Sequence, residues 1–213
     1  MEGLNRVRER IAAAAAKAGR DVRQIKLIAV SKLQPLEKLR EAVAAGHTVF
    51  GENYAQELRE KAEALGPGVE WHFIGALQSN KARLVVGRAA VIHTCDRLSL
   101  AREISKRATA PQRVLLEVNV GREPQKAGVL PEDAPALLEQ VRALPNLACE
   151  GLMCIPPADQ DPRPHFRALR ELAERLQLRE LSMGMSTDFE AAIEEGATMV
   201  RVGTAIFGER PRK

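Results

Sequence analysis

The sequence predicts an α/β protein built as a single (β/α)8 barrel with an extra helix at its N-terminus. Eight short apolar runs alternate with longer helical patterns from one end of the chain to the other. The runs are rich in Val, Ile, Leu and Met, as buried parallel strands are. Eight strand–helix units in 213 residues match a compact TIM-type barrel, since such barrels begin at about 200 residues. An open doubly wound sheet stays as the alternative, because strand order cannot be read from a sequence.

The expected strands follow directly from the apolar runs. They are Lys26–Ser31, Thr48–Gly51, Glu70–Gly75, Val91–Thr94, Arg113–Val120, Ala148–Ile155, Glu180–Met185 and Met199–Gly203.

The segments between the strands carry apolar residues at helical spacing, as Leu36, Leu39 and Val43 illustrate. Asp96 and Asp188 stand where helix N-caps are expected. The expected helices are Gly3–Ala18 before the first strand, then Pro35–Ala45, Asn53–Leu65, Gln78–Val86, Asp96–Ala108, Pro131–Leu144, Arg163–Leu176 and Asp188–Glu195.

The composition indicates one domain over residues 1–213 and a cytoplasmic protein. No linker or low-complexity tract divides the chain, and no apolar run approaches the ~20 residues of a membrane span. The 32 basic and 28 acidic residues form no block, so nothing favours nucleic-acid binding. Three cysteines without CxxC spacing, and histidines without metal-ligand spacing, favour neither disulfides nor a metal site.

Lys32 is the first candidate for chemistry, because the active site of a parallel barrel forms at the C-terminal ends of its strands. Lys32 follows the apolar run Leu27–Val30, with only Ser31 between them. Partial desolvation there would lower its pKa and make a neutral amine available for a Schiff base. The alternative is a rim lysine whose stem packs on the barrel while its ammonium stays hydrated.

The loops after the last two strands are the second candidate. Ser182–Asp188 and Arg201–Thr204 contain Gly, Ser and Thr where barrels often hold a phosphate. Ordinary helix capping is the alternative. Together with Lys32, a phosphate site suggests a phosphorylated aldehyde held as an imine, either pyridoxal 5′-phosphate (PLP) or a sugar phosphate in an aldolase. His72 lies inside a strand and is better interpreted as a core or rim histidine than as a catalyst.

Six segments resemble the pyridoxal phosphate homeostasis proteins, a family related to the N-terminal barrel of alanine racemase. They extend from the first expected strand to the last, so the resemblance covers essentially the whole chain. The segments are AVSKLQP (Ala29–Pro35), FGENYAQE (Phe50–Glu57), WHFIGALQSNK (Trp71–Lys81), GLMCI (Gly151–Ile155), LSMGMSTDFEAAI (Leu181–Ile193) and RVGTAIFG (Arg201–Gly208).

The resemblance implies a role for each matching residue. Lys32 would hold PLP as an internal aldimine, and Arg201 would face the pyridine nitrogen. Arginine can only donate hydrogen bonds, so this nitrogen would stay unprotonated and the ring would be a poor electron sink. The resemblance assigns the phosphate to Ser186, Gly203 and Thr204, and it places Asn53 and Met153 near the ring.

The resemblance implies intracellular PLP homeostasis by a binding protein without marked catalytic activity. We expect it to be a monomer or weak dimer and to deliver PLP to apo-enzymes. The alternative is a PLP-dependent racemase or isomerase, and a class I-like aldolase is a third reading. Racemisation needs a base on each face of the imine, and alanine racemase takes its second base, a tyrosine, from a separate domain. We expect no such domain here, and we interpret the single tyrosine, Tyr54, as a packing residue.

Overall fold

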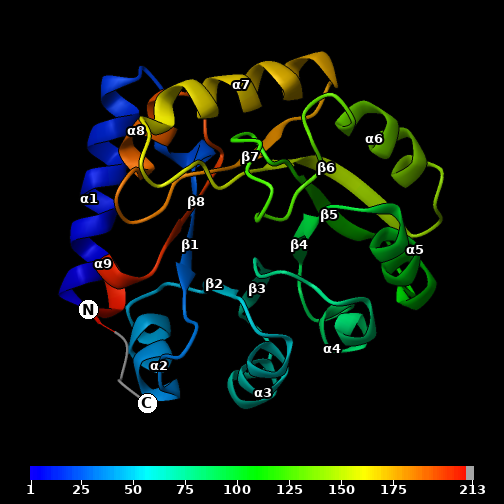
Figure 1. The fold of residues 1–213 in the computed structure, drawn as a ribbon. Coiled ribbons are helices and arrows are strands. Elements are labelled where there is room, and N and C mark those ends of the chain that lie inside the picture. The colour runs from blue at the N-terminus through cyan, green and yellow to red at the C-terminus, as the bar shows by residue number, and fades with distance from the viewer. Residues whose placement is uncertain (210–213) are drawn as a thin grey trace.

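The computed structural model describes residues 1–209. Eight parallel strands in this part of the chain close into a barrel in sequence order, and helices surround it (Figure 1). The closing pair joins the first and last strands, with Ile28 opposite Arg201. This closure confirms the predicted barrel and excludes the open sheet. The strands are β1 Lys26–Val30, β2 Val49–Glu52, β3 Glu70–Phe73, β4 Val91–Cys95, β5 Gln112–Glu117, β6 Leu147–Met153, β7 Glu180–Ser182 and β8 Met199–Val202.

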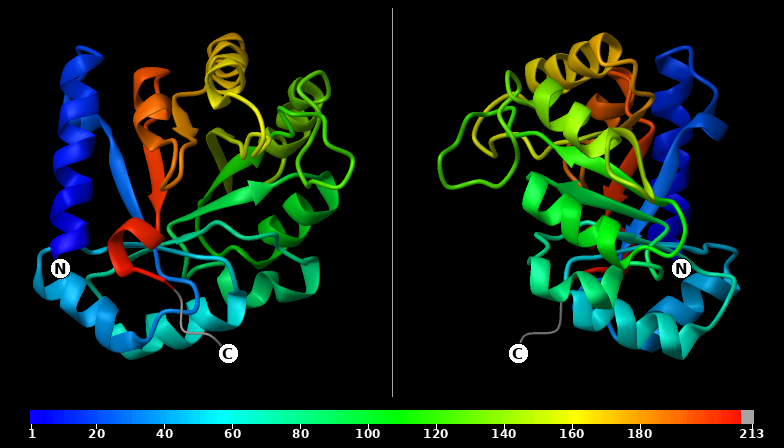
Figure 2. Two further views of the ribbon diagram at one scale, coloured as in Figure 1. Left: turned by 60° about the vertical axis from the view of Figure 1, so that its left-hand side comes forward. Right: turned by 90° about the vertical axis from the view of Figure 1, so that its right-hand side faces the viewer.

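The helices alternate with these strands as expected. Figure 2 shows from two further sides how α2, α3 and α4 follow one another around the barrel. The helices are α1 Glu2–Lys17, α2 Leu36–Ala44, α3 Ala55–Leu65, α4 Ala82–Val85, α5 Leu98–Arg107, α6 Ala134–Arg142, α7 Pro162–Arg175, α8 Phe189–Glu194 and α9 Thr204–Phe207, with short 3-10 turns at Val22–Gln24 and Ser79–Lys81.

Two local expectations about helix starts meet different outcomes. Asp188 is the N-cap residue of α8, and its carboxylate accepts a hydrogen bond from the Met185 amide at 2.6 Å. Asp96 is not an N-cap: Arg97 occupies that position of α5, and the Asp96 carboxylate instead pairs with the Arg97 guanidinium. The helix therefore begins at Leu98, and no side-chain hydrogen bond caps its first turn.

The predicted N-terminal helix is present and covers the outside of the barrel. One face of α1 is buried at Leu4, Val7 and Ile11, and the helix packs against α8 and α9 (Figure 1). Spacings of three and four residues place these side chains on one stripe. Removing this stripe from water is what holds the helix to the fold.

The interior of the barrel is only partly apolar. Ile28, Val91, Leu115, Met153 and Met199 form a small apolar cluster. It is separate from the larger core that also includes the buried faces of the helices. Buried polar side chains from several strands occupy the same interior, among them two histidines and an arginine. Polar groups at this depth require hydrogen-bond partners.

No helix within residues 1–209 has the length and apolar character needed to cross a membrane. The same residues contain no group of three or more His, Cys, Asp or Glu side chains arranged to hold a metal ion.

Candidate functional site

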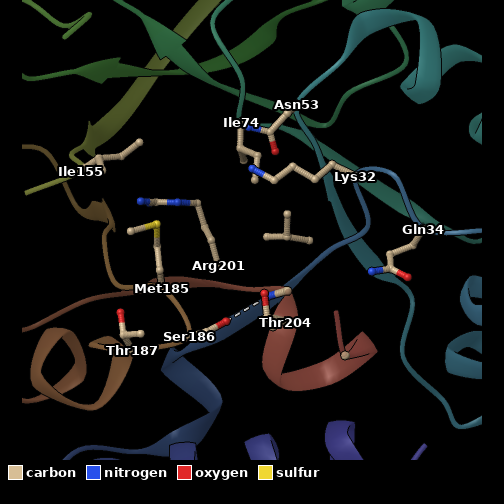
Figure 3. A pocket seen from close by; sticks show the side chains of 13 residues that line it. Lys32, Gln34, Asn53, Ile74, Ile155, Met185, Ser186, Thr187, Arg201 and Thr204 are labelled. Carbon is tan, nitrogen blue, oxygen red and sulfur yellow. Dashed lines mark hydrogen bonds between the residues drawn. The ribbon is translucent and has the colours of Figure 1, made fainter. Parts of the chain in front are cut away.

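A cavity of about 280 Å³ opens at the C-terminal ends of the strands. Figure 3 shows Lys32 reaching into it from the loop after β1, with Ser186 and Thr204 together at one end and Arg201 between them and Ile155. The lining residues come from loops far apart in the sequence: Val30, Lys32, Gln34, Asn53, Ile74, Ile155, Met185, Ser186, Thr187, Arg201, Gly203, Thr204 and Gly208.

The backbone on both sides of Lys32 is held by side chains of α3. Lys61 Nζ donates to the Ser31 carbonyl at 2.7 Å, and the Leu33 amide donates to Glu57 Oε2 at 2.9 Å. Leu33 adopts a left-handed conformation with φ of 60°. Such a backbone is unfavourable for leucine, so the surrounding contacts must maintain it. The loop therefore presents Lys32 in a fixed place.

A buried ion pair underlies this loop. Glu52 is fully buried, and its Oε1 lies 2.7 Å from Lys61 Nζ and 2.6 Å from Ser31 Oγ. Lys61 also pairs with Glu57 at 2.8 Å. Burial raises the pKa of Glu52 above its usual range, and the Lys61 ammonium opposes that effect. Lys61 thus compensates two carboxylates while anchoring the backbone before Lys32.

The opposite end of the cavity is formed by the loops after β7 and β8. The Gly203 amide and Ser186 Oγ are 3.4 Å apart, which brings the two loops together (Figure 3). Thr204 begins α9, and amides in the first turn of a helix have no carbonyl within the helix to receive them. Gly184 has φ of 93°, and a Cβ there would lie 2.6 Å from Ala192 Cβ. Glycine at this position therefore lets the loop after β7 pack against α8.

Arg201 lies in β8 and lines the cavity. Its side chain is 4% exposed. Nη1 donates to Ser182 Oγ at 2.6 Å, and Nη2 donates to the Cys154 carbonyl at 2.9 Å. Two contacts from two different strand ends fix the plane of the guanidinium. The other N–H groups of this guanidinium donate to no acceptor within residues 1–209.

Most of the predicted site residues come together. Among the residues that line this cavity are Lys32, Asn53, Ser186, Arg201, Gly203 and Thr204. Met153 differs from the expectation, because it belongs to the apolar cluster inside the barrel and not to the cavity wall. Met185, Ile74 and Ile155 supply the apolar surface instead.

Tyr54 corrects a second expectation. It is the N-cap residue of α3 and 52% exposed, so it is not a packing residue. It borders a neighbouring cavity of about 360 Å³ that shares only Asn53 with the first.

Sequence reasoning missed the contacts behind the cavity. Nothing in the strand pattern indicates that Lys61 reaches Glu52 or that Ser182 reaches Arg201. For Lys61, the (i, i+4) spacing from Glu57 was a usable signal, since such pairs meet on a helix face.

Glu117 lines a smaller cavity of about 170 Å³ that shares Ile155 with the first, and its burial predicts a pH-dependent stability. Burial raises the pKa of Glu117 to about 7. Its carboxyl is therefore neutral in the fold below this pH, and the stability that protonation supplies is lost as the pH rises from about 4.5 to about 7. Between these two pH values, we expect the free energy of unfolding of Glu117→Gln to rise by about 3 kcal/mol relative to that of the parent. Each pKa unit corresponds to about 1.4 kcal/mol.

Urea unfolding of both proteins at several pH values measures this difference. Glu139→Gln, at an exposed position of α6, is the control. A difference between parent and Glu117→Gln that stays constant from pH 4.5 to pH 8 would contradict the assignment.

Comparisons with known proteins identify chains that are similar to this one over nearly its whole length. The profile of the family described as "Alanine racemase, N-terminal domain" matches residues 3–211. The pyridoxal phosphate homeostasis protein of Aquifex aeolicus is 51% identical to this chain, over 98% of the chain and 97% of that protein. The chain belongs to the pyridoxal phosphate homeostasis protein family.

Two other members of the family are similar over nearly their whole length, and an alanine racemase shares only the fold. The protein of Escherichia coli K12 is 42% identical, over 97% of this chain and 95% of its own. PipY of Synechococcus elongatus, solved with PLP bound, has a TM-score of 0.83 and 38% identity, covering 95% of this chain and all of that one. Alanine racemase of Corynebacterium glutamicum has a TM-score of 0.72 at 19% identity and shares the fold over 62% of its chain.

Proposed function

We propose that this protein holds PLP as a Schiff base between Lys32 and the PLP aldehyde, and serves intracellular PLP homeostasis in the cytoplasm without marked catalytic activity of its own. The observation that carries the proposal is that one cavity is lined by Lys32, the buried Arg201 and both glycine-containing loops. The PLP bound to PipY supports the same ligand, since that protein is 38% identical.

The cavity fits the ligand in size and in unused polar groups. Its volume of about 280 Å³ is close to the lower limit for small-molecule sites, about 300 Å³. Asn53 Oδ1 is buried and lacks a hydrogen-bond partner among the described residues. A buried polar atom without a partner is costly unless a bound molecule satisfies it. Asn53 borders the cavity and points towards Lys32 in Figure 3.

The loops after β7 and β8 and the Arg201 guanidinium each suit one part of PLP. Ser186, Gly203 and Thr204 would hold the phosphate through hydroxyl and amide donors. Arg201 would donate to the pyridine nitrogen, and because arginine has no acceptor, this nitrogen would carry no proton. When bound, PLP supplies a reactive aldehyde and an electron-accepting ring. The unprotonated ring accepts electrons poorly, which suits retention of PLP better than catalysis.

A racemase is the second candidate, on the strength of the shared fold. Racemisation needs one base on each face of the bound imine. Lys32 could serve one face, but among the described residues that line the cavity there is no tyrosine or histidine for the other. Tyr54 is exposed and borders the neighbouring cavity.

Trapping of the bound ligand tests the proposal. Purified protein is incubated with PLP, reduced with borohydride, digested and mapped by mass spectrometry. We expect a visible absorption band before reduction and a single stable adduct at Lys32 afterwards. A colourless protein with no adduct at Lys32 would refute PLP binding through this residue.

Isotope exchange separates the two candidate functions. The PLP-loaded protein is incubated with L-alanine in D₂O. We expect no catalytic accumulation of D-alanine and no rapid incorporation of deuterium at Cα. Prompt exchange with formation of D-alanine would replace the binding protein with a racemase.

We further propose that the protein acts as a monomer or weak dimer, and that PLP-dependent apo-enzymes receive the released ligand. Release requires transfer of the imine to another amine or its hydrolysis, and the open position of Lys32 at the strand ends allows both.

A further inference from the structure

A chain of hydrogen bonds crosses the interior of the barrel and ends on the guanidinium at the cavity. Arg201 Nη1 lies 2.6 Å from Ser182 Oγ, which lies 2.8 Å from His93 Nδ1. His93 Nε2 lies 2.8 Å from His72 Nδ1, and His72 Nε2 lies 2.7 Å from Glu70 Oε1. The serine and both histidines are fully buried. The chain thus links β8, β7, β4 and β3 without a gap.

The direction of these hydrogen bonds follows from arginine having no acceptor. Ser182 must accept from Arg201, so its hydroxyl proton is free to go to His93 Nδ1. His93 then carries its proton on Nε2 and donates to His72, whose own Nε2–H donates to the Glu70 carboxylate. The reverse direction would place the lone pair of a neutral His72 Nε2 against that carboxylate. All donors therefore point away from the cavity.

Both histidines are neutral in this arrangement. Burial lowers the pKa of His72 and lowers the pKa of His93 well below its usual range. A second proton on His93 would add a positive charge near Arg201 and leave the Ser182 hydroxyl proton without an acceptor. The neutral chain satisfies every polar atom that takes part, which is the condition for a rigid buried network.

The series of hydrogen bonds ends, on the side away from the cavity, at the charged carboxylate of Glu70. Glu70 Oε1 also lies 2.6 Å from Lys26 Nζ, at the N-terminal end of the barrel. The hydrogen bond from His72 is the largest cause that lowers the pKa of Glu70 to about 2. A permanent carboxylate at one end and a permanent guanidinium at the other set one direction for the donors between them.

We infer that Ser182 and His93, with His72 behind them, are positioning residues that orient Arg201 so that one of its N–H groups faces the ring nitrogen of PLP. This inference rests on the proposed function. Ser182 occupies one side of the guanidinium, and the Cys154 carbonyl occupies another. The unused N–H groups are thereby directed to the cavity. The barrel interior accordingly selects ligands whose ring presents a nitrogen acceptor at this place.

The inference is tested by comparing PLP with its 1-deaza analogue, in which a C–H group replaces the ring nitrogen. Affinities of both ligands are measured for the parent protein, Ser182→Ala and Ser182→Thr. We expect the parent to prefer PLP and Ser182→Ala to reduce that preference about tenfold, the size of one hydrogen bond to a charged group. Ser182→Thr keeps the hydroxyl and is expected to restore it.

The ratio of affinities separates positioning from general loss of structure. A merely structural role for Ser182 would weaken both ligands equally, and an unchanged ratio would overturn the inference. Failure of the parent protein to bind PLP would instead refute the proposed function.

A second measurement needs no variant. In the parent protein loaded with ¹⁵N-labelled PLP, the chemical shift of the ring nitrogen is expected to be that of an unprotonated, hydrogen-bonded pyridine. A protonated pyridinium would overturn the inference even if Ser182→Ala failed to fold.

Discussion

Replacement of Lys32 by alanine is expected to abolish covalent retention of PLP. The visible absorption band and the borohydride-trapped adduct should fall to the background of unloaded protein, because no other lysine borders the cavity within the described residues. Weak binding should persist, since Arg201 and the two loops after β7 and β8 are untouched. Absorption spectra and equilibrium dialysis of the purified variant measure the two effects separately.

The matched control for this experiment is Lys106→Ala, at an exposed position of α5 outside the cavity. It should retain the full band and adduct. A trapped adduct of undiminished yield in Lys32→Ala would mean that another amine holds the ligand.

Replacement of Lys61 by methionine is expected to lower the free energy of unfolding by about 3–5 kcal/mol. The change removes the cation beside Glu52, which is fully buried, and leaves that carboxylate uncompensated. It also releases the Ser31 carbonyl next to Lys32. Urea unfolding measures the loss. Because protonation removes the buried charge, the loss should be smaller at pH 5 than at pH 8.

Two further variants examine the cause of that loss. Glu52→Gln in the Lys61→Met background removes the uncompensated charge and should recover a substantial part of the stability. Lys17→Met breaks an exposed pair with Glu194 and should cost less than about 1 kcal/mol. Equal losses in Lys61→Met and Lys17→Met would show that burial of Glu52 has no energetic consequence.

Much of the cavity could be predicted because parallel strands in a barrel end at the same edge. Lys32 follows one apolar run, and the Gly203–Thr204 pair follows another, so their convergence needs only the strand order. Met153 shows the limit of this reasoning. The strand containing it was predicted, but its side chain lies in the interior cluster and not in the cavity wall. Side-chain direction at a strand end depends on register and on local irregularities such as the register shift between β5 and β6.

The sequence by itself determines where the strands and helices form, because apolar periodicity and turn residues act within a few positions of one another. Six of the 13 residues that line the cavity were also predicted, from the ends of the expected strands and from the family resemblance. Only the tertiary structure decided which polar groups meet inside the barrel. These contacts join residues that are 9 to 89 positions apart in the sequence. They are the contact from Lys61 to Glu52 and those from Arg201 through Ser182 to His93. Such contacts form when the closed barrel brings the strands and the surrounding helices together and excludes water, and burial then makes each polar atom require a specific partner.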